Sequence, residues 1–419
     1  MRMRLGIFLG GALLLAATYA QAFNVVGYFI SWGSPGLEET LRYEYLTHIN
    51  YSFLLPTASG GLDPTFSSAE QLDRVVQLAH SKNVKVLISV GGWNNGDDSA
   101  FHNIAASPAL RNTFINNLYN YVIQHNLDGV DVDWEFPGSE GSDGFLLLMS
   151  ELSERLRGSG KLLTAAVWGW NADGVAGSVY PYVDFLNLMT YDGGVPHSTY
   201  EMAVSSLNYW NGLGLPRDKT NLGIPFYGSD ARWDQMDYDD LVSRDGNAPY
   251  KDEGGQESVA GYYYNSVSTV MDKTALAAER AGGVMIWALN FDVSGAGSLL
   301  SAIHETATGG SPGPVTITTN ALPSGNAGAA YGTVTLSASG GTAPYQWAMV
   351  SGTLPPGLTL GTGTGAIGGV LSGTQGTFTF AVRCTDSTGQ TAEKTFALVV
   401  NPSTYANKPP SFPTGLRIN

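Results

Sequence analysis

The sequence is poor in cysteine, in basic residues and in long apolar runs. Its 419 residues include one cysteine, Cys384, so no disulfide can form within the chain. Lys and Arg number 21 against 36 Asp and Glu, which gives a formal net charge of -15 at pH 7. Phosphate backbones are bound by basic patches, so this balance argues against a nucleic-acid partner. Beyond the first residues no run is long enough to cross a bilayer, so we expect no membrane partner.

Metal and cofactor chemistry also has little support. The six histidines show no metal-ligand spacing. We therefore expect no metal and no cofactor, and we expect a monomer. Hydrophobic residues make up 43% of the chain, which is typical of a globular protein with a large core. Cys384 is expected to be a small buried side chain rather than a reactive thiol.

The first 22 residues have the pattern of an export signal. Arg2 and Arg4 precede an apolar run over residues 5–17, and Ala20 and Ala22 provide the small residues of a cleavage site. We expect a signal peptide that is removed after Ala22, and a secreted protein, either extracellular or periplasmic. An uncleaved membrane anchor is the alternative.

Residues 23–305 alternate short β-rich runs with amphipathic stretches, including predicted helices over 69–82, 108–125 and 143–157. About eight such repeats predict an α/β fold, the (β/α)₈ TIM barrel, with its active site at the carboxyl ends of the strands. The β-rich runs are NVVGYFI, THINYSFL, VKVLISVGG, LDGVDVDWE, LLTAAVW, VDFLNLMTYD, NLGIPFYG and GVMIWALN.

The sequence after the barrel changes in composition. Residues 306–314 are a Gly/Pro linker, and residues 315–401, with little charge and alternating β-formers, predict an all-β immunoglobulin-like sandwich. Tyr345 and Trp347 share a strand face, so this module is either a spacer or a sugar-binding domain. Residues 402–419 predict a second linker and the possible start of a truncated fibronectin type III module, in which case the chain is a fragment of a longer protein.

The stretch DGVDVDWE, residues 128–135, places Asp131, Asp133 and Glu135 on one face of a predicted strand. Carboxylates this close cannot all ionise freely, so at least one pKa must rise. A carboxylic acid that stays protonated near neutral pH at the rim of a barrel is what a general acid requires. A magnesium or calcium site and a solvated acidic face are the alternatives.

These residues carry a family resemblance. DGVDVDWE resembles the D-x-x-D-x-D-x-E signature of glycoside hydrolase family 18, which contains chitinases and endo-β-N-acetylglucosaminidases. SVGGW, MTYD, GIPFYG and GGVMIWALN are similar to other segments of that family, over residues 24–303 in all. A stretch of the C-terminal module, beginning LPPGLTL, resembles bacterial immunoglobulin-like modules.

The resemblance implies roles for individual residues. Glu135 would be the general acid and base, Asp133 would hold the substrate's acetamido N–H, and Asp131 would share a proton with Asp133. Tyr191 would donate its hydroxyl to the acetamido oxygen, while Asp128 would hold the strand and its turn. The substrate-binding positions would be Tyr28, Phe53, Trp93, Met189, Asp192, Tyr227 and Trp287.

The function implied is that of a secreted endo-chitinase that cleaves β-1,4-N-acetylglucosamine linkages with retention and with help from the substrate. An endo-β-N-acetylglucosaminidase acting on N-glycan cores is the main alternative, and an inactive chitin-binding lectin is the other. Two local features remain open. The segment between Tyr227 and Gly283 predicts an irregular insertion, either a groove wall or a surface loop, ending in a helix. His197 is predicted to be an ordinary loop residue, and Trp233 has no motif to support a role.

Overall fold

A computed structural model describes most of the chain. The described residues are 23–33, 36–172, 174–175, 177–251, 257–295, 297–308, 315–319, 321–336, 338–339, 345–373, 375–386 and 389–403. The predicted signal peptide, most of the Gly/Pro linker and nearly all of residues 402–419 lie outside them. Among the described residues no helix is both long enough and apolar enough to span a membrane.

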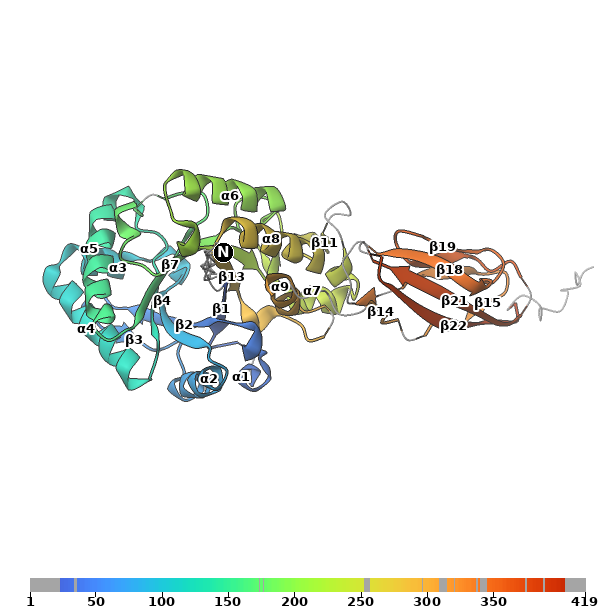
Figure 1. The fold of residues 1–419 in the computed structure, drawn as a ribbon, viewed down its shortest axis with the longest axis horizontal. Coiled ribbons are helices and arrows are strands. Elements are labelled where there is room, and N and C mark those ends of the chain that lie inside the picture. The colour runs from blue at the N-terminus through green and yellow to red at the C-terminus, as the bar shows by residue number, and fades with distance from the viewer. Residues whose placement is uncertain are drawn as a thin grey trace, which may run out of the picture.

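Eight parallel strands close into a barrel. Their order is β1, β13, β8, β7, β6, β5, β4 and β2, and β1 also pairs with β2 and so completes the ring. Figure 1 shows the helices packed around these strands, and the sandwich, in orange and red, beside the barrel. The barrel strands are β1 (Asn24–Ile30), β2 (His48–Pro56), β4 (Lys85–Gly91), β5 (Gly129–Asp133), β6 (Leu162–Trp168), β7 (Phe185–Met189), β8 (Thr220–Pro225) and β13 (Gly283–Trp287).

The helix α2 begins at a capping residue and buries the face that its periodicity predicts. In α2 the Ser68 hydroxyl accepts the Gln71 N–H at 3.3 Å, and Leu72, Val75, Val76 and Ala79 are buried. The predicted helix over 143–157 begins earlier, at Gly138. The α-helices are α1 (Leu37–Thr40), α2 (Ala69–Ser81), α3 (Ser99–Ala106), α4 (Pro108–Gln124), α5 (Gly138–Arg157), α6 (Tyr200–Gly212), α7 (Tyr238–Arg244), α8 (Val267–Arg280) and α9 (Leu299–Ala307).

Short elements complete the barrel domain. A two-residue strand, β3 (Leu62–Asp63), pairs with the end of β2. The 3₁₀ turns are η1 (Tyr43–Tyr45), η2 (Asn94–Gly96), η3 (Gly177–Val179), η4 (Arg217–Lys219), η5 (Ala248–Tyr250) and η7 (Leu289–Phe291).

The insertion after β8 is regular, which corrects the sequence prediction. Its strands form a four-stranded antiparallel sheet in the order β10, β9, β12 and β11, with α7 packed beside it. The sequence signal was weak because each strand has only two or three residues, too few to show a period. The strands are β9 (Tyr227–Ser229), β10 (Gln235–Asp237), β11 (Ser258–Val259) and β12 (Tyr262–Tyr263).

The C-terminal module is an all-β sandwich with its own hydrophobic core, so the predicted fold class is confirmed. Trp347 is only 4% exposed, which removes the observation that favoured a sugar-binding face there. Cys384 is buried as predicted, and burial raises the pKa of its thiol to about 11. The strands are β14 (Thr316–Ile317), β15 (Gly325–Asn326), β16 (Ala330–Thr335), β17 (Ala338–Ser339), β18 (Gln346–Gly352), β19 (Leu358–Leu360), β20 (Ala366–Val370), β21 (Gly376–Thr385) and β22 (Thr391–Asn401).

Candidate active site

Asp131, Asp133 and Glu135, here called the acidic row, lie at the carboxyl end of β5 and face the inside of the barrel. Val130 and Val132, which alternate with the acidic residues, belong to the core between the strands and the helices. Asp131 and Asp133 must therefore point the other way, into the barrel. The strand ends at Asp133, two residues earlier than predicted, so Glu135 lies in the loop that follows. The row thus runs from the barrel interior to its mouth.

Asp131 is fully buried and its carboxylate is surrounded by donors. Its Oδ2 accepts hydrogen bonds from the hydroxyls of Tyr28 at 2.7 Å and Ser89 at 2.8 Å. Its Oδ1 accepts one from the Thr164 hydroxyl at 2.5 Å and one from the Asn187 amide at 3.4 Å. Burial raises the pKa of Asp131, and these four bonds oppose that rise. Neighbouring strands thus hold this carboxylate in a fixed position.

Asp133 differs from Asp131 because the described residues provide no partner for one of its carboxylate oxygens. It is 4% exposed, and its buried Oδ1 has no hydrogen-bond partner among the described residues. No hydrogen bond links it to Asp131, whose two oxygens are already bonded to the donors described above. Burial, followed by the charges of Glu135 and Asp131, raises the pKa of Asp133 well above its usual value. An unpaired oxygen of this kind is available to accept a hydrogen bond from a ligand.

Close packing holds β5 against β4 at this point. Gly91, in the segment SVGGW, has a φ of 113°, which favours glycine. A Cβ atom there would lie 2.1 Å from the Asp133 carbonyl oxygen, so a larger residue would push the two strands apart. At the opposite end of β5, the Asp128 carboxylate accepts the Val86 N–H at 2.8 Å and lies 2.8 Å from His80 Nε2. Asp128 therefore has the structural role that the sequence predicts.

Glu135 has the pKa that a general acid needs near neutral pH. Burial, followed by the negative charge of Asp192, raises the pKa of Glu135 to about 7. A substantial fraction of the side chain is then protonated at pH 7. Asp192 follows β7, which is separated from β5 by one strand, β6.

Tyr191, Asp192 and Tyr227 follow β7 and β8 and form another side of the site. The Tyr227 hydroxyl donates to Asp192 Oδ2 at 2.7 Å, and the rings of Tyr191 and Tyr227 are 6.0 Å apart in an edge-to-face arrangement. The Tyr191 hydroxyl lies 3.8 Å from the sulfur of Met285. A thioether is a weak acceptor, so this hydroxyl proton remains available to a ligand.

These residues line one groove with a volume of about 660 Å³. Trp287 lies within it, edge-on to Tyr28 at 5.6 Å and stacked near Phe53 at 5.7 Å. All the predicted site residues line the groove except Asp131, which lies below it and reaches it through Tyr28. Those that line it are Tyr28, Phe53, Trp93, Asp133, Glu135, Met189, Tyr191, Asp192, Tyr227 and Trp287.

The groove also contains aromatic residues that the sequence did not single out. Trp32 and Trp233 line it and are 54% and 52% exposed, and Phe66 packs edge-on against Trp32 at 5.7 Å. Trp233 belongs to the inserted segment, which therefore forms one wall of the groove. Trp168 lines it as well. Large aromatic faces that remain exposed are suited to stacking on the apolar C–H faces of sugar rings.

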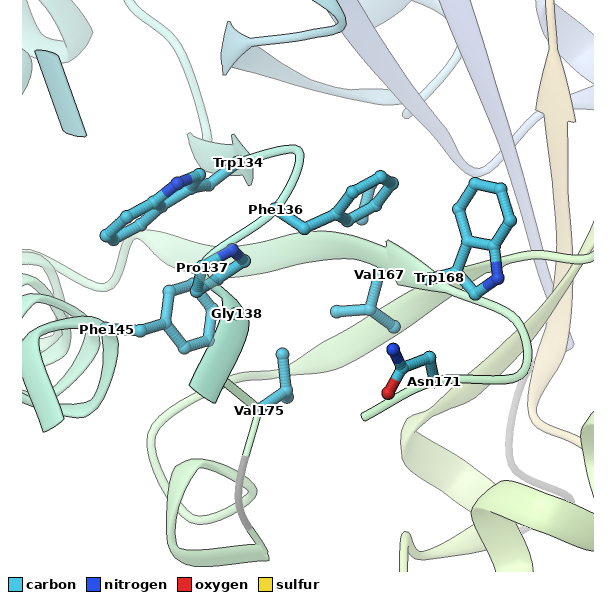
Figure 2. A pocket seen from close by; sticks show the side chains of 10 residues that line it. Trp134, Phe136, Pro137, Gly138, Phe145, Val167, Trp168, Asn171 and Val175 are labelled. Carbon is cyan, nitrogen blue, oxygen red and sulfur yellow. The ribbon is translucent and has the colours of Figure 1, made fainter. Parts of the chain in front are cut away.

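A smaller cavity of about 320 Å³ adjoins the groove (Figure 2). Figure 2 shows Phe136 on the loop after β5 and Trp168 at the end of β6, and their rings are edge-to-face at 5.2 Å. Trp168 and Ala166 line both spaces. The side chain of Trp168 thus separates the groove from an apolar recess.

His197 is in the loop after β7, as predicted, but it is not an ordinary surface residue. It is 1% exposed, and its Nδ1 lies 3.1 Å from Asp192 Oδ1. The prediction missed this contact because four loop residues lie between the two positions and no periodicity relates them. Among the described residues no group of three or more His, Cys, Asp or Glu side chains could hold a metal ion.

Comparisons with known proteins agree on one family. Residues 24–292 match the model for glycosyl hydrolases family 18, and residues 307–401 match that of a putative Ig domain. The chain is 26% identical to "Probable chitinase 10" of Drosophila melanogaster over 65% of its length, but spans only 15% of that protein. It is 25% identical to "Chitinase A1" of Niallia circulans, with 98% of this chain and 79% of that one covered.

A solved structure supports the same assignment for the barrel. The crystal structure of the GH18 chitinase ChiB from Flavobacterium johnsoniae is 28% identical and has a TM-score of 0.60. The match covers 69% of this chain and 95% of that one.

Proposed function

Because the chain belongs to family 18 of the glycosyl hydrolases, we propose that it is a secreted chitinase that cleaves β-1,4 linkages between N-acetylglucosamine units. The observation that carries the proposal is the pair formed by Glu135 and Asp133. Glu135 has a pKa of about 7, and beside it Asp133 keeps a buried carboxylate oxygen unpaired in an aromatic groove. An acid and an unpaired acceptor fit a sugar that carries an acetamido group. The sequence pattern of residues 1–22, which predicts an export signal, supports secretion.

The proposed mechanism assigns each step to a group of the groove or of the substrate. Glu135 protonates the glycosidic oxygen, and the acetamido oxygen of the sugar attacks its own anomeric carbon as the leaving group departs. Asp133 accepts the acetamido N–H, and the Tyr191 hydroxyl donates to the acetamido oxygen, so both orient the group that attacks. Water then opens the oxazolinium intermediate, with Glu135 acting as base, and the anomeric configuration is retained.

Asp192 is poorly placed to be a second catalytic carboxylate. Asp133, Glu135 and Asp192 are the acidic residues among those that line the groove. Both carboxylate oxygens of Asp192 are occupied, one by Tyr227 and one by His197. A carboxylate nucleophile would have to face the anomeric carbon from the far side of the sugar. Assistance by the substrate's own acetamido group requires no such residue.

The test is the set of products from defined substrates. We expect the protein to release short N-acetylglucosamine oligomers from chitohexaose and to leave a high-mannose glycoprotein intact. Release of the glycan, with chitohexaose uncut, would identify an endo-β-N-acetylglucosaminidase instead. Binding of chitohexaose without any cleavage would indicate a lectin.

The pKa of Glu135 predicts how activity depends on pH. As the general acid, Glu135 must be protonated, so kcat/KM should fall as pH rises above about 7. Above that value the fall should be about tenfold per pH unit. The measurement is kcat/KM for a soluble chitooligosaccharide between pH 4 and 10. A profile that stays flat up to pH 9 would contradict the role of Glu135.

A further inference from the structure

The side chains of His197 and Asp192 form a buried pair at the edge of the groove. An ionised carboxylate can only accept, so His197 Nδ1 donates its hydrogen to Asp192 Oδ1 across the 3.1 Å between them. His197 is 1% exposed, while the Asp192 side chain is 29% exposed and faces the groove. The backbone at Asp192 has a φ of 59°, which a non-glycine residue rarely adopts. The loop after β7 therefore holds both residues in one specific arrangement.

Among the described residues, the groups around the pair leave the His197 imidazole with one hydrogen-bond partner, Asp192. The ring of Tyr227 from β9 lies 4.9 Å from that of His197, and its hydroxyl donates to the other oxygen of Asp192. On the next residue, Ser198, the carbonyl and hydroxyl oxygens accept from Lys273 of α8, each at 2.8 Å. His197 Nε2 is buried without a hydrogen-bond partner among the described residues. The described contacts of the imidazole thus orient Asp192 and do little else.

The orientation of the Asp192 carboxylate affects the pKa of the proposed acid, Glu135. The charge of Asp192 is one of the two causes that raise the pKa of Glu135. Coulomb interactions weaken with distance and with hydration. If Asp192 turned toward solvent, its effect on Glu135 would diminish.

We propose that His197 is a positioning residue, which fixes the carboxylate of Asp192 toward Glu135 and so sets the upper pH limit of activity. The inference rests on the proposed function, in which Glu135 acts as the general acid. His197 is not among the residues that line the groove, so in this proposal it acts through Asp192. Tyr227 holds one carboxylate oxygen and His197 holds the other, so removal of His197 leaves Asp192 free to rotate about its remaining bond.

Three substitutions distinguish the effect of the hydrogen bond from the effect of the size of the His197 ring. His197→Phe keeps the ring beside Tyr227 but removes the donor. His197→Gln keeps a polar side chain, but its amide nitrogen lies near the position of Nε2 rather than that of Nδ1. His197→Asn places an amide N–H close to the Nδ1 position and can restore the bond. A matched control is His125→Phe, because His125 is also buried and lies 2.8 Å from an aspartate, Asp73, but does not line the groove.

The experiment measures kcat/KM against pH for these variants with chitohexaose. The alkaline limb of the kcat/KM profile should move to lower pH by about half a unit or more in His197→Phe and His197→Gln. Above the midpoint, this shift corresponds to about a threefold loss of kcat/KM. The limb should stay in place in His197→Asn and in His125→Phe. In an Asp192→Asn background, His197→Phe should cause no further shift. An unmoved limb in both the Phe and Gln variants, or equal shifts in all three, would overturn the proposal.

A second measurement does not depend on turnover. The ¹³C resonance of the Glu135 carboxyl, identified by its absence in Glu135→Gln, should titrate at lower pH in His197→Phe than in the parent protein. If the parent protein does not cleave chitohexaose, the proposed function fails, yet this titration still tests the role of His197. An identical titration in parent and variant would contradict that role even in an active enzyme.

Discussion

Replacing Glu135 by glutamine is expected to reduce kcat on chitohexaose by at least about 10²–10⁴-fold, the range that a general acid–base residue contributes. Glutamine has nearly the same shape but no titratable proton, so the leaving oxygen would depart without protonation. Because the aromatic groove is unchanged, the affinity for the oligosaccharide should remain within a few-fold. The measurements are the steady-state rate and the binding of chitohexaose to the variant by calorimetry.

A comparison with a neighbouring carboxylate makes this test specific. Asp128→Asn changes a residue of the same stretch that bonds to Val86 at the opposite end of the strand. That variant should lose some thermal stability and keep kcat within a few-fold. If Glu135→Gln turned over an unactivated oligosaccharide at nearly the normal rate, Glu135 could not be the acid.

The barrel and the acidic row could be predicted from sequence because both depend on local periods. Strand alternation puts Asp131 and Asp133 on the face opposite Val130 and Val132, and the structure has this arrangement. The family resemblance carried by DGVDVDWE was confirmed by the match over residues 24–292. The four hydrogen bonds that the Asp131 carboxylate accepts come from residues on four other strands, so no local sequence pattern predicts them.

The residues missed by the sequence depend on contacts between distant segments. Trp233 is in a short inserted hairpin, and whether it is exposed or buried is decided by where the inserted sheet lies. Trp32 follows β1 in a loop, where an aromatic residue alone favours core packing as much as binding. His197 and Asp192 pair through a loop with no regular period. The end of β5 at Asp133 was also missed, since Trp134 and Glu135 continue the alternation after the pairing has stopped.

The second large effect concerns the substrate rather than the protein. Oligomers of fully deacetylated chitosan are expected to resist cleavage, with a rate at or below the detection limit. These sugars lack the acetamido oxygen that attacks the anomeric carbon in the proposed mechanism, and they carry an amine in place of the amide whose N–H would donate to Asp133. The measurement is product release from glucosamine hexamers and from N-acetylglucosamine hexamers under the same conditions.

Two further observations test the same mechanism independently of affinity. The first product from chitohexaose should be the β-anomer, detected by NMR before mutarotation, because two displacements at the anomeric carbon restore its configuration. A thiazoline analogue of the oxazolinium should compete with substrate. Asp133→Asn should weaken binding of this analogue more than it weakens binding of chitohexaose, because the Asp133 carboxylate stabilises the developing positive charge.

An α-anomer formed first, or efficient cleavage next to a deacetylated sugar, would exclude assistance by the acetamido group, even if Glu135 proved essential. In that case Asp192 would be the remaining candidate for a nucleophile, because Asp133, Glu135 and Asp192 are the acidic residues that line the groove.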